Sequence, residues 1–345
     1  MHAWPGVLNR AVPEVSVLLP FRDCASTLEE ALESILGQRG VRHEVIAVDD
    51  GSRDAGSSIA QGLAARHAAL RVVRTAGIGI PRALQLAAQH AQSELLARMD
   101  GDDVAHEQRL ARQLDALARA PDLAVLGTRV ESFPAAAVGE GLARYVAWQN
   151  ELLTAGDHSR QLFVESPLCH PSIVLRRAAF DAVGGYRDGD FPEDYDLFLR
   201  LEAAGYALAK LPDVLLRWRQ HEARATLTDT RYDRARFLAA KAPHLARRLL
   251  QLGRPIDFWG AGTTGKRIAR ALEPYGVRAG RFIDIDPEKI GRSARGVPIV
   301  AAADVTPPAG RTVVVAVAAR GARDLVRGQL EALGYREGFD YLCAT

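Results

Sequence analysis

The chain has 345 residues, of which 48% are hydrophobic and 25% charged, and its formal net charge is +2. This length exceeds that of one ordinary hydrophobic core, so we expect two domains. The balanced charge offers no strong positive field for a polyanion, which argues against nucleic-acid binding. The cysteines are three in number and far apart, which argues against a disulfide framework.

No apolar segment is long enough to cross a bilayer. The longest apolar run, 313–319, is far shorter than the roughly 20 residues that a membrane-spanning helix needs. Residues 1–12 lack the apolar core of a signal peptide. We therefore expect a cytoplasmic protein without a transmembrane segment.

The first half of the chain alternates strands and helices. The run 15–20 predicts a buried strand, 27–38 a helix with one apolar face, and 43–50 a second strand. The same order recurs as 70–75, 81–90 and 94–100. Such alternation is typical of a doubly wound α/β sheet.

The second half of the chain predicts a further domain. Helices are expected over 176–185 and 194–204, and a strand, helix and strand pattern restarts at Pro255. The predicted division is an N-terminal tail (1–13), a first α/β domain (14–223), a helical linker (224–254) and a smaller Rossmann-like α/β domain (255–345).

Acidic residues follow three of the predicted strands. Pro20 to Asp23 end the first strand, Asp49 and Asp50 the second, and 100–103 a later one. Ligands of doubly wound sheets bind beyond the carboxyl ends of the strands. Because such crowding of like charge is unfavourable by itself, we expect these carboxylates to serve a ligand.

The segment ARMDGDD, 97–103, carries the sharpest chemical signal. Asp100 and Asp102 are separated by one glycine on a tight turn, so both can address one divalent cation that in turn binds a diphosphate. The alternative is a turn that caps the following helix, since aspartate is common there.

Four motifs in order make the first 225 residues or so similar to glycosyltransferase family 2, which has the GT-A fold. They are Pro20-Phe21 at the end of the first strand, VDDGSRD over 48–54, DGDD over 100–103, and Glu193-Asp194 before a helix. The resemblance implies a mixed, doubly wound sheet and transfer of a sugar with inversion. It departs from many members at Arg22-Asp23, so the nucleotide base stays open.

The resemblance also implies roles for single residues. Pro20, Phe21 and Asp49 would contact the donor nucleotide, Asp100 the ribose and metal, Asp102 the metal, His221 the metal or diphosphate, and Asp194 would be the general base. The chemistry requires such a set, because a cation can stabilise the departing diphosphate and a carboxylate must accept the proton of the acceptor. The alternative for Asp194 is a helix cap.

A glycine-rich turn marks the C-terminal domain. Gly260, Gly262 and Gly265 fit G-x-G-x-x-G, and Asp284 follows at the distance of a ribose-binding acid. These residues predict a site for a nucleotide or NAD, although such glycines also serve helix packing alone. Residues 255–345 resemble the small N-terminal nucleotide-sugar-binding domains of sugar acyltransferases, which implies a binding or regulatory module.

The predicted function is therefore a metal-dependent, inverting glycosyltransferase that uses Mg²⁺ or Mn²⁺ and a nucleotide diphosphate donor, with a UDP-sugar favoured. The acceptor would be a glycan or lipid-linked glycan of the bacterial surface, reached at the inner face of the membrane. Three alternatives stay open: an NAD-dependent oxidoreductase that uses the GAGTTG turn, a nucleotidyltransferase, and a non-catalytic nucleotide-sugar-binding protein. The nucleotidyltransferase is disfavoured because 20–25 contains no glycine to hold a triphosphate.

Overall fold

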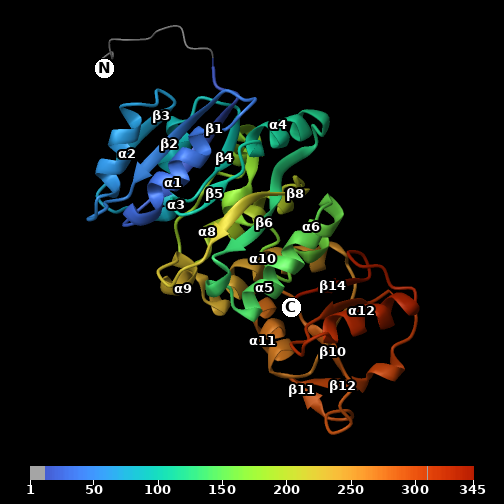
Figure 1. The fold of residues 1–345 in the computed structure, drawn as a ribbon. Coiled ribbons are helices and arrows are strands. Elements are labelled where there is room, and N and C mark those ends of the chain that lie inside the picture. Colours follow the sequence, from blue (N-terminus) through green and yellow to red (C-terminus); the bar gives the residue numbers. More distant parts are fainter. Residues whose placement is uncertain (1–11, 309) are drawn as a thin grey trace. The chain divides into compact units, whose positions relative to one another are not determined.

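The structure is a computed structural model that describes residues 12–308 and 310–345 (Figure 1). The predicted tail therefore lies largely outside the described residues. By its internal contacts the chain forms two units. The first comprises the chain up to Leu153 with Leu168–Asp188 and Gly205–Arg224, and the second comprises Thr154–Pro167, Gly189–Ala204 and Ala225–Thr345. The domain boundaries at 223 and 254 stay predictions.

The first unit is built on an eight-stranded mixed sheet in the order β3-β2-β1-β4-β7-β6-β8-β5. Its strands are β1 (Val15–Phe21), β2 (His43–Asp49), β3 (Leu70–Arg74), β4 (Leu95–Arg98), β5 (Val104–Ala105), β6 (Leu123–Phe133), β7 (Val174–Arg176) and β8 (Ala207–Arg219). β1 to β4 run parallel, whereas β7 is antiparallel to both of its neighbours. This mixed α/β sheet confirms the predicted fold class.

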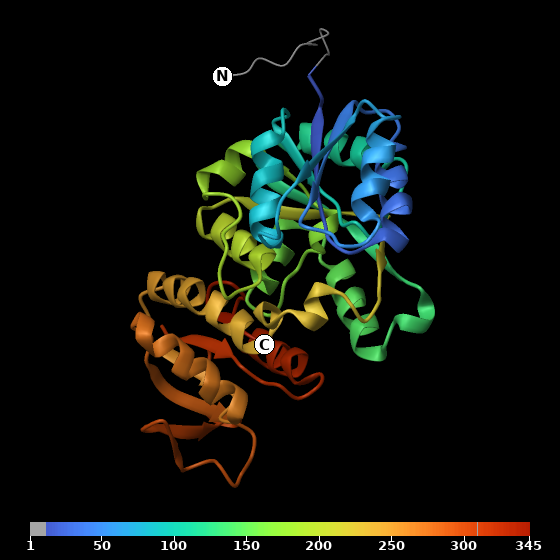
Figure 2. The same cartoon turned by 90° about the vertical axis from the view of Figure 1, so that its left-hand side faces the viewer.

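Helices cover both faces of the parallel strands. Figure 2 shows α3 on one side of the strands and α1 and α2 on the other. The helices of this unit are α1 (Ala25–Leu36), α2 (Gly56–Ala64), α3 (Ile80–His90), α4 (Arg109–Arg119), α5 (Glu140–Glu151) and α7 (Arg177–Ala182). In α1 the buried residues are Leu28, Ala31, Leu32 and Ile35, which form an apolar stripe at helical spacing. Since both faces are covered, every residue of β1 is buried.

The second unit contains a six-stranded sheet in the order β11-β12-β10-β9-β13-β14. Its strands are β9 (Ile256–Trp259), β10 (Ala279–Asp284), β11 (Ser293–Ala294), β12 (Val297–Ala301), β13 (Thr312–Val315) and β14 (Tyr341–Cys343). All neighbours pair in parallel except β11 with β12. The predicted smaller α/β sheet after the first one is thus present.

The helices of the second unit come from distant parts of the chain. They are α6 (Ala155–Gln161), α8 (Glu193–Ala203), α9 (Ala225–Thr228), α10 (Arg234–Gln251), α11 (Thr263–Leu272) and α12 (Ala322–Ala332). α10 lies in the segment predicted as a linker and packs against α8 and α11. No helix among the described residues has both the length and the apolarity to span a membrane.

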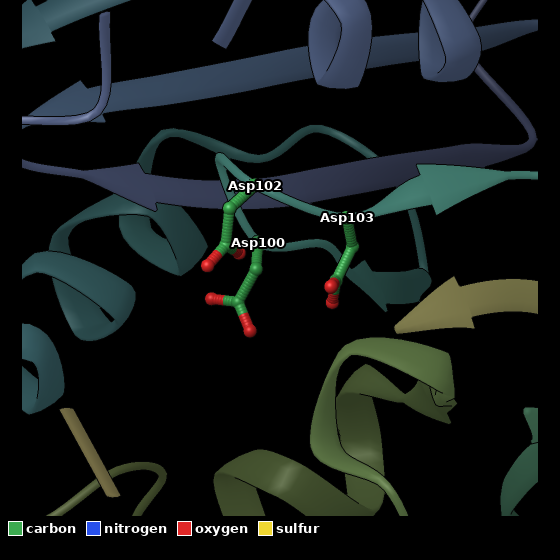
Figure 3. A group of neighbouring side chains, drawn as sticks. All are labelled: Asp100, Asp102 and Asp103. Carbon is green, nitrogen blue, oxygen red and sulfur yellow. The ribbon is translucent and has the colours of Figure 1, made fainter. Parts of the chain in front are cut away.

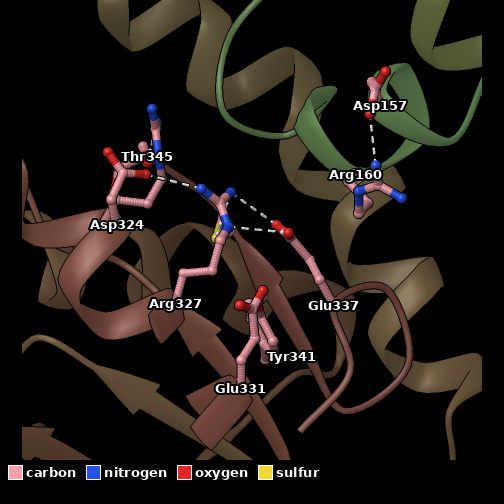
Figure 4. A network of polar contacts seen from close by, with 10 residues as sticks. Asp157, Arg160, Asp324, Arg327, Glu331, Glu337, Tyr341 and Thr345 are labelled. Carbon is pink, nitrogen blue, oxygen red and sulfur yellow. Dashed lines mark hydrogen bonds and ion pairs between the residues drawn. The ribbon is translucent and has the colours of Figure 1, made fainter. Parts of the chain in front are cut away.

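Ion pairs tie α12 to the end of the chain (Figure 4). The guanidinium of Arg327 lies 3.1 Å from both carboxylate oxygens of Glu337, and it also pairs with Asp324 in the same helix. The Tyr341 hydroxyl donates to Glu331 over 3.1 Å. The bidentate pair of Arg327 with Glu337 is the strong form of the arginine–carboxylate pair. The bond from Tyr341 to Glu331 joins β14 to α12.

Two glycines of the GAGTTG turn are required by packing. Gly260 has φ +117°, and a Cβ there would lie 2.6 Å from the carbonyl oxygen of Ala316. A Cβ at Gly265 would lie 1.8 Å from the carbonyl oxygen of Gly260. At Gly262, by contrast, a Cβ would meet nothing within 4 Å. Close helix-to-strand packing therefore accounts for Gly260 and Gly265 but not for Gly262.

This contrast gives a matched pair of variants. We expect Gly265→Ala to lower the free energy of unfolding by more than about 2 kcal/mol, because overpacking forces the turn apart. Gly262→Ala should change it by less than about 1 kcal/mol. Urea denaturation followed by circular dichroism compares the two, and equal stabilities would contradict the packing account.

Candidate functional site

The carboxyl ends of β1, β2 and β4 meet at one edge of the first sheet. In the parallel register of β1 and β2, Phe21 stands opposite Asp49. The backbone N–H of Met99, just after β4, donates to the carbonyl of Leu18 over 3.1 Å. The segments that the sequence singled out after these strands are therefore neighbours in space.

Three carboxylates of one turn form the centre of this edge. Figure 3 shows Asp100, Asp102 and Asp103 on the turn between β4 and β5, and one oxygen of each lies within 4.8 Å of the others. A Cβ at Gly101 would lie 3.0 Å from the Cβ of Phe21, so a glycine lets the turn approach β1. Carboxylate oxygens in such an array suit Mg²⁺ or Mn²⁺.

Asp100 and Asp102 each have a cationic or protonatable partner. The guanidinium of Arg98, which is 4% exposed, pairs with a carboxylate oxygen of Asp100. Nε2 of His221 lies 2.8 Å from Oδ2 of Asp102. Burial and the neighbouring Asp100 raise the pKa of Asp102, and the hydrogen bond to His221 opposes this. The three residues predicted around a metal, Asp100, Asp102 and His221, are thus brought together.

Asp103 has an orphaned oxygen. Its Oδ1 accepts the backbone N–H of Arg219 over 2.8 Å, whereas its buried Oδ2 has no hydrogen-bond partner among the described residues. Burial and the charges of Asp100 and Asp102 raise the pKa of Asp103 well above its ordinary value. A buried, unsatisfied carboxylate oxygen in a cluster of acids fits a bound cation, which would supply the missing charge.

The Asp49 carboxylate is fully buried but only half satisfied. Its Oδ1 accepts the backbone N–H of Ser52 over 2.8 Å. Its Oδ2 makes no hydrogen bond among the described residues and lies 3.5 Å from Nε of Arg74. An acceptor oxygen therefore stands next to a cation at the end of β2.

The neighbouring carboxylate, that of Asp50, has a structural role. Its carboxylate accepts the hydroxyl of Thr75 and the backbone N–H of Ile78, both over 2.6 Å, and the N–H of Gly79 over 2.9 Å. These bonds fix the loop between β3 and α3. The paired acids of VDDGSRD therefore differ: the protein supplies three hydrogen bonds to Asp50, whereas Oδ2 of Asp49 has only the ion pair with Arg74 among the described residues.

Pro20 and Phe21 lie where they were predicted, at the end of β1, and both are buried. Phe21 is 4% exposed and belongs to the hydrophobic core of this unit, and its Cβ lies beside the turn at Gly101. After it, Asp23 adopts φ 50° and its carboxylate accepts the backbone N–H of Arg53 over 2.7 Å. This bond joins the ends of β1 and β2.

Asp194 stands in the first turn of α8, in the second unit. The N-cap is Pro192 and makes no side-chain capping bond, while Oδ1 of Asp194 accepts the N–H of Tyr195 over 2.7 Å. Asp194 is half-buried, whereas its neighbour Glu193 is 2% exposed. The acidic first turn is favoured by the helix dipole.

In the C-terminal sheet, the predicted ribose-binding acid, Asp284, contacts the GAGTTG turn. Oδ2 of Asp284 accepts the N–H of Ala261 over 2.9 Å, between Gly260 and Gly262, and Lys289 lies 3.3 Å away. Asp284 and the glycines are thus neighbours as predicted. Their role as a nucleotide or NAD site stays a prediction.

Sequence reasoning missed Arg98, Arg219 and the orphan oxygen of Asp103. Arg98 lies inside ARMDGDD and could have been suspected from its position beside Asp100. Arg219 comes from the far end of β8, and its Nε donates to the carbonyl of Asp102 over 2.6 Å. Only the pairing of β5 with β8 reveals that contact.

Comparison with known proteins gives consistent results. The model of the family "Glycosyl transferase family 2" matches residues 16–184. The amylovoran biosynthesis glycosyltransferase AmsE of Erwinia amylovora is 27% identical over 209 residues, covering 59% of this chain and 75% of that protein. The UDP-Gal:alpha-D-GlcNAc-diphosphoundecaprenol beta-1,3-galactosyltransferase of Escherichia coli is 26% identical over 196 residues, covering 56% of this chain and 69% of that protein.

A solved structure shares the fold. S. aureus TarS 1–349 in complex with UDP-GlcNAc superposes with a TM-score of 0.56 and 16% identity, covering 76% of this chain and 71% of that chain. At this identity the likeness concerns the fold alone, and it supports the GT-A architecture expected from the sequence.

Proposed function

Because the chain is a glycosyltransferase whose residues 16–184 belong to family 2, we propose that it transfers a sugar from a nucleoside diphosphate donor to an acceptor hydroxyl, with a divalent cation and with inversion. The observation that carries the proposal is the cluster of Asp100, Asp102 and Asp103, with its orphaned buried oxygen. The family assignment sets aside the oxidoreductase, nucleotidyltransferase and non-catalytic alternatives.

The cation would be held by Asp100 and Asp102, with His221 beside it. When bound, it would stabilise the negative charge of the departing diphosphate. Arg98 pairs with the Asp100 carboxylate and would hold it in place, and Nε2 of His221 orients Asp102. Both oxygen-preferring ions, Mg²⁺ and Mn²⁺, suit the set.

Oδ2 of Asp49, which makes no hydrogen bond among the described residues, would select the nucleotide base. A carboxylate oxygen accepts a hydrogen bond and cannot donate one while ionised. Uracil, thymine and guanine present a ring N–H to such an oxygen, whereas adenine and cytosine have only an exocyclic amino group to donate, with an acceptor ring nitrogen beside it. This supports a UDP-sugar, with dTDP- and GDP-sugars as the next candidates.

Asp194 would act as general base. In the proposed step the acceptor oxygen attacks the anomeric carbon, its proton passes to the Asp194 carboxylate, and the bond from that carbon to the diphosphate oxygen breaks. One displacement inverts the anomeric centre and needs no covalent nucleophile. Asp194 is half-buried, in the first turn of α8.

The acceptor class is proposed from the relatives. One is named for the biosynthesis of amylovoran, and another for transfer to a sugar on diphosphoundecaprenol. We propose a glycan or lipid-linked glycan of the bacterial surface, reached from the cytoplasm at the inner face of the membrane.

Replacement of Asp102 tests the donor site. We expect UDP with Mn²⁺ to raise the Tm of the wild type, because a ligand that binds only the folded state stabilises it. In Asp102→Asn this metal-dependent shift should disappear, while the exposed Asp122→Asn should keep it. Differential scanning fluorimetry with UDP, GDP, dTDP and NAD, each with and without Mn²⁺, makes the comparison. An equal shift in both variants would contradict the assignment.

Replacement of Asp194 tests the base. Asp194→Asn keeps the shape of the side chain but cannot accept the proton, so we expect release of nucleoside diphosphate to fall about 100-fold or more. Binding of UDP with Mn²⁺ should be retained. The assay measures the nucleoside diphosphate released from a panel of nucleotide sugars with water as acceptor. Turnover equal to that of the wild type would rule Asp194 out as the base.

A further inference from the structure

The helix that begins at Glu193 is held by residues Ala225–Thr345, called here the C-terminal extension. α8 packs against α10, and both belong to the second unit (Figure 1). The side chains of Tyr195 and Phe237 are in contact there, with ring centroids 5.3 Å apart. The extension thus contributes directly to the surroundings of the helix on which Asp194 stands.

One contact reaches the first turn of α8. The hydroxyl of Tyr232 lies 2.8 Å and 3.1 Å from the two carboxylate oxygens of Glu193, which is 2% exposed. Burial and the carboxyls of Glu193 and Asp194 raise the pKa of Tyr232 well above its ordinary value, so the phenol keeps its proton and donates. A buried carboxylate without such a donor is strongly destabilised.

Further contacts hold other residues of the helix. The hydroxyl of Tyr195, which is fully buried, donates to the carbonyl of Leu162 over 2.6 Å. Near the other end of α8, Arg248 of α10 pairs with Glu202. Tyr195 in the first turn and Glu202 near the end of α8 are held in this way, and the Tyr232–Glu193 bond adds a contact at the residue that precedes Asp194.

Lys241 joins residues 154–167 to the C-terminal end of the chain. The ammonium group of Lys241, in α10, lies 2.7 Å from the carbonyl of Phe163 and 2.9 Å from that of Ala344. Residues 154–167, which support Tyr195, are thereby joined to the end of β14. The C-terminal sheet and α8 therefore share one scaffold.

We propose that Tyr232 is a positioning residue for sugar transfer: it holds Glu193 and thereby fixes the orientation of Asp194, so that the C-terminal extension completes the catalytic helix. This inference rests on the proposed role of Asp194. Tyr232 acts through Glu193 and touches no reacting atom. Small displacements of a catalytic group lower the rate steeply, because the reactive geometry is narrow.

Tyr232→Phe removes only the hydroxyl. We expect its kcat for diphosphate release to fall about 10- to 100-fold, measured with the best donor of the panel, Mn²⁺ and water as acceptor, at a temperature below the Tm of every variant. The KM for the donor and the Tm shift with UDP and Mn²⁺ should not change, because neither depends on Asp194. Tyr275→Phe, an exposed tyrosine of the same unit, is the matched control and should keep wild-type kcat.

A double-mutant cycle identifies Glu193 as the intermediary. Glu193→Gln leaves only a neutral amide oxygen, a weaker acceptor than the carboxylate, so it should also lower kcat. The double variant should be no slower than the slower single variant, because both changes weaken one contact. Glu193→Gln also keeps the test available if Tyr232→Phe does not fold. Independent, additive losses would overturn the proposal.

The test of the positioning role can be distinguished from the test of Asp194 as the base. If Asp194→Asn is inactive while Tyr232→Phe and Glu193→Gln keep wild-type kcat, the positioning role is wrong and the proposed function stands. If Asp194→Asn keeps wild-type turnover, the base assignment is wrong and the positioning role is overturned with it. If Tyr232→Phe lowers kcat and also raises the donor KM and lowers the Tm of the protein, its role is structural only.

Discussion

Electrostatic repulsion among Asp100, Asp102 and Asp103 is the constraint around which the first unit is arranged, since their oxygens lie within 4.8 Å of one another. Two like charges at about 4 Å near a protein surface repel by about 4 kcal/mol. Arg98, His221 and the backbone N–H of Arg219 each offset part of this cost. A divalent cation would offset the rest, which links the stability of the turn to the chemistry proposed for it.

The parallel strands could be predicted from the sequence because their signals are local. Val15–Phe21 is a continuous apolar run, and His43–Asp49 has the same character before its acids. The carboxyl ends of neighbouring parallel strands share one edge, so the placement of Asp49 and the turn after β4 at the same edge followed from topology. The order of the motifs supplied the family, and the family implied Asp194 and His221.

The supporting contacts could not be predicted, because they join segments far apart in sequence. Arg219 reaches the turn through the pairing of β5 with β8, and Tyr232 reaches Glu193 from a segment predicted as a linker. For the GAGTTG turn the sequence motif located the glycines correctly. Packing alone accounts for Gly260 and Gly265, however, so the motif did not establish a ligand-binding role for them. A motif therefore locates residues more reliably than it assigns their task.

The most direct test of the central claim is the anomalous diffraction of crystals grown with Mn²⁺ and UDP, recorded at the manganese absorption edge. We predict one strong peak within coordination distance, about 2.2 Å, of carboxylate oxygens of Asp100 or Asp102, with the diphosphate on its other side. Ordered UDP without such a peak, or a peak only at the GAGTTG turn, would contradict the account.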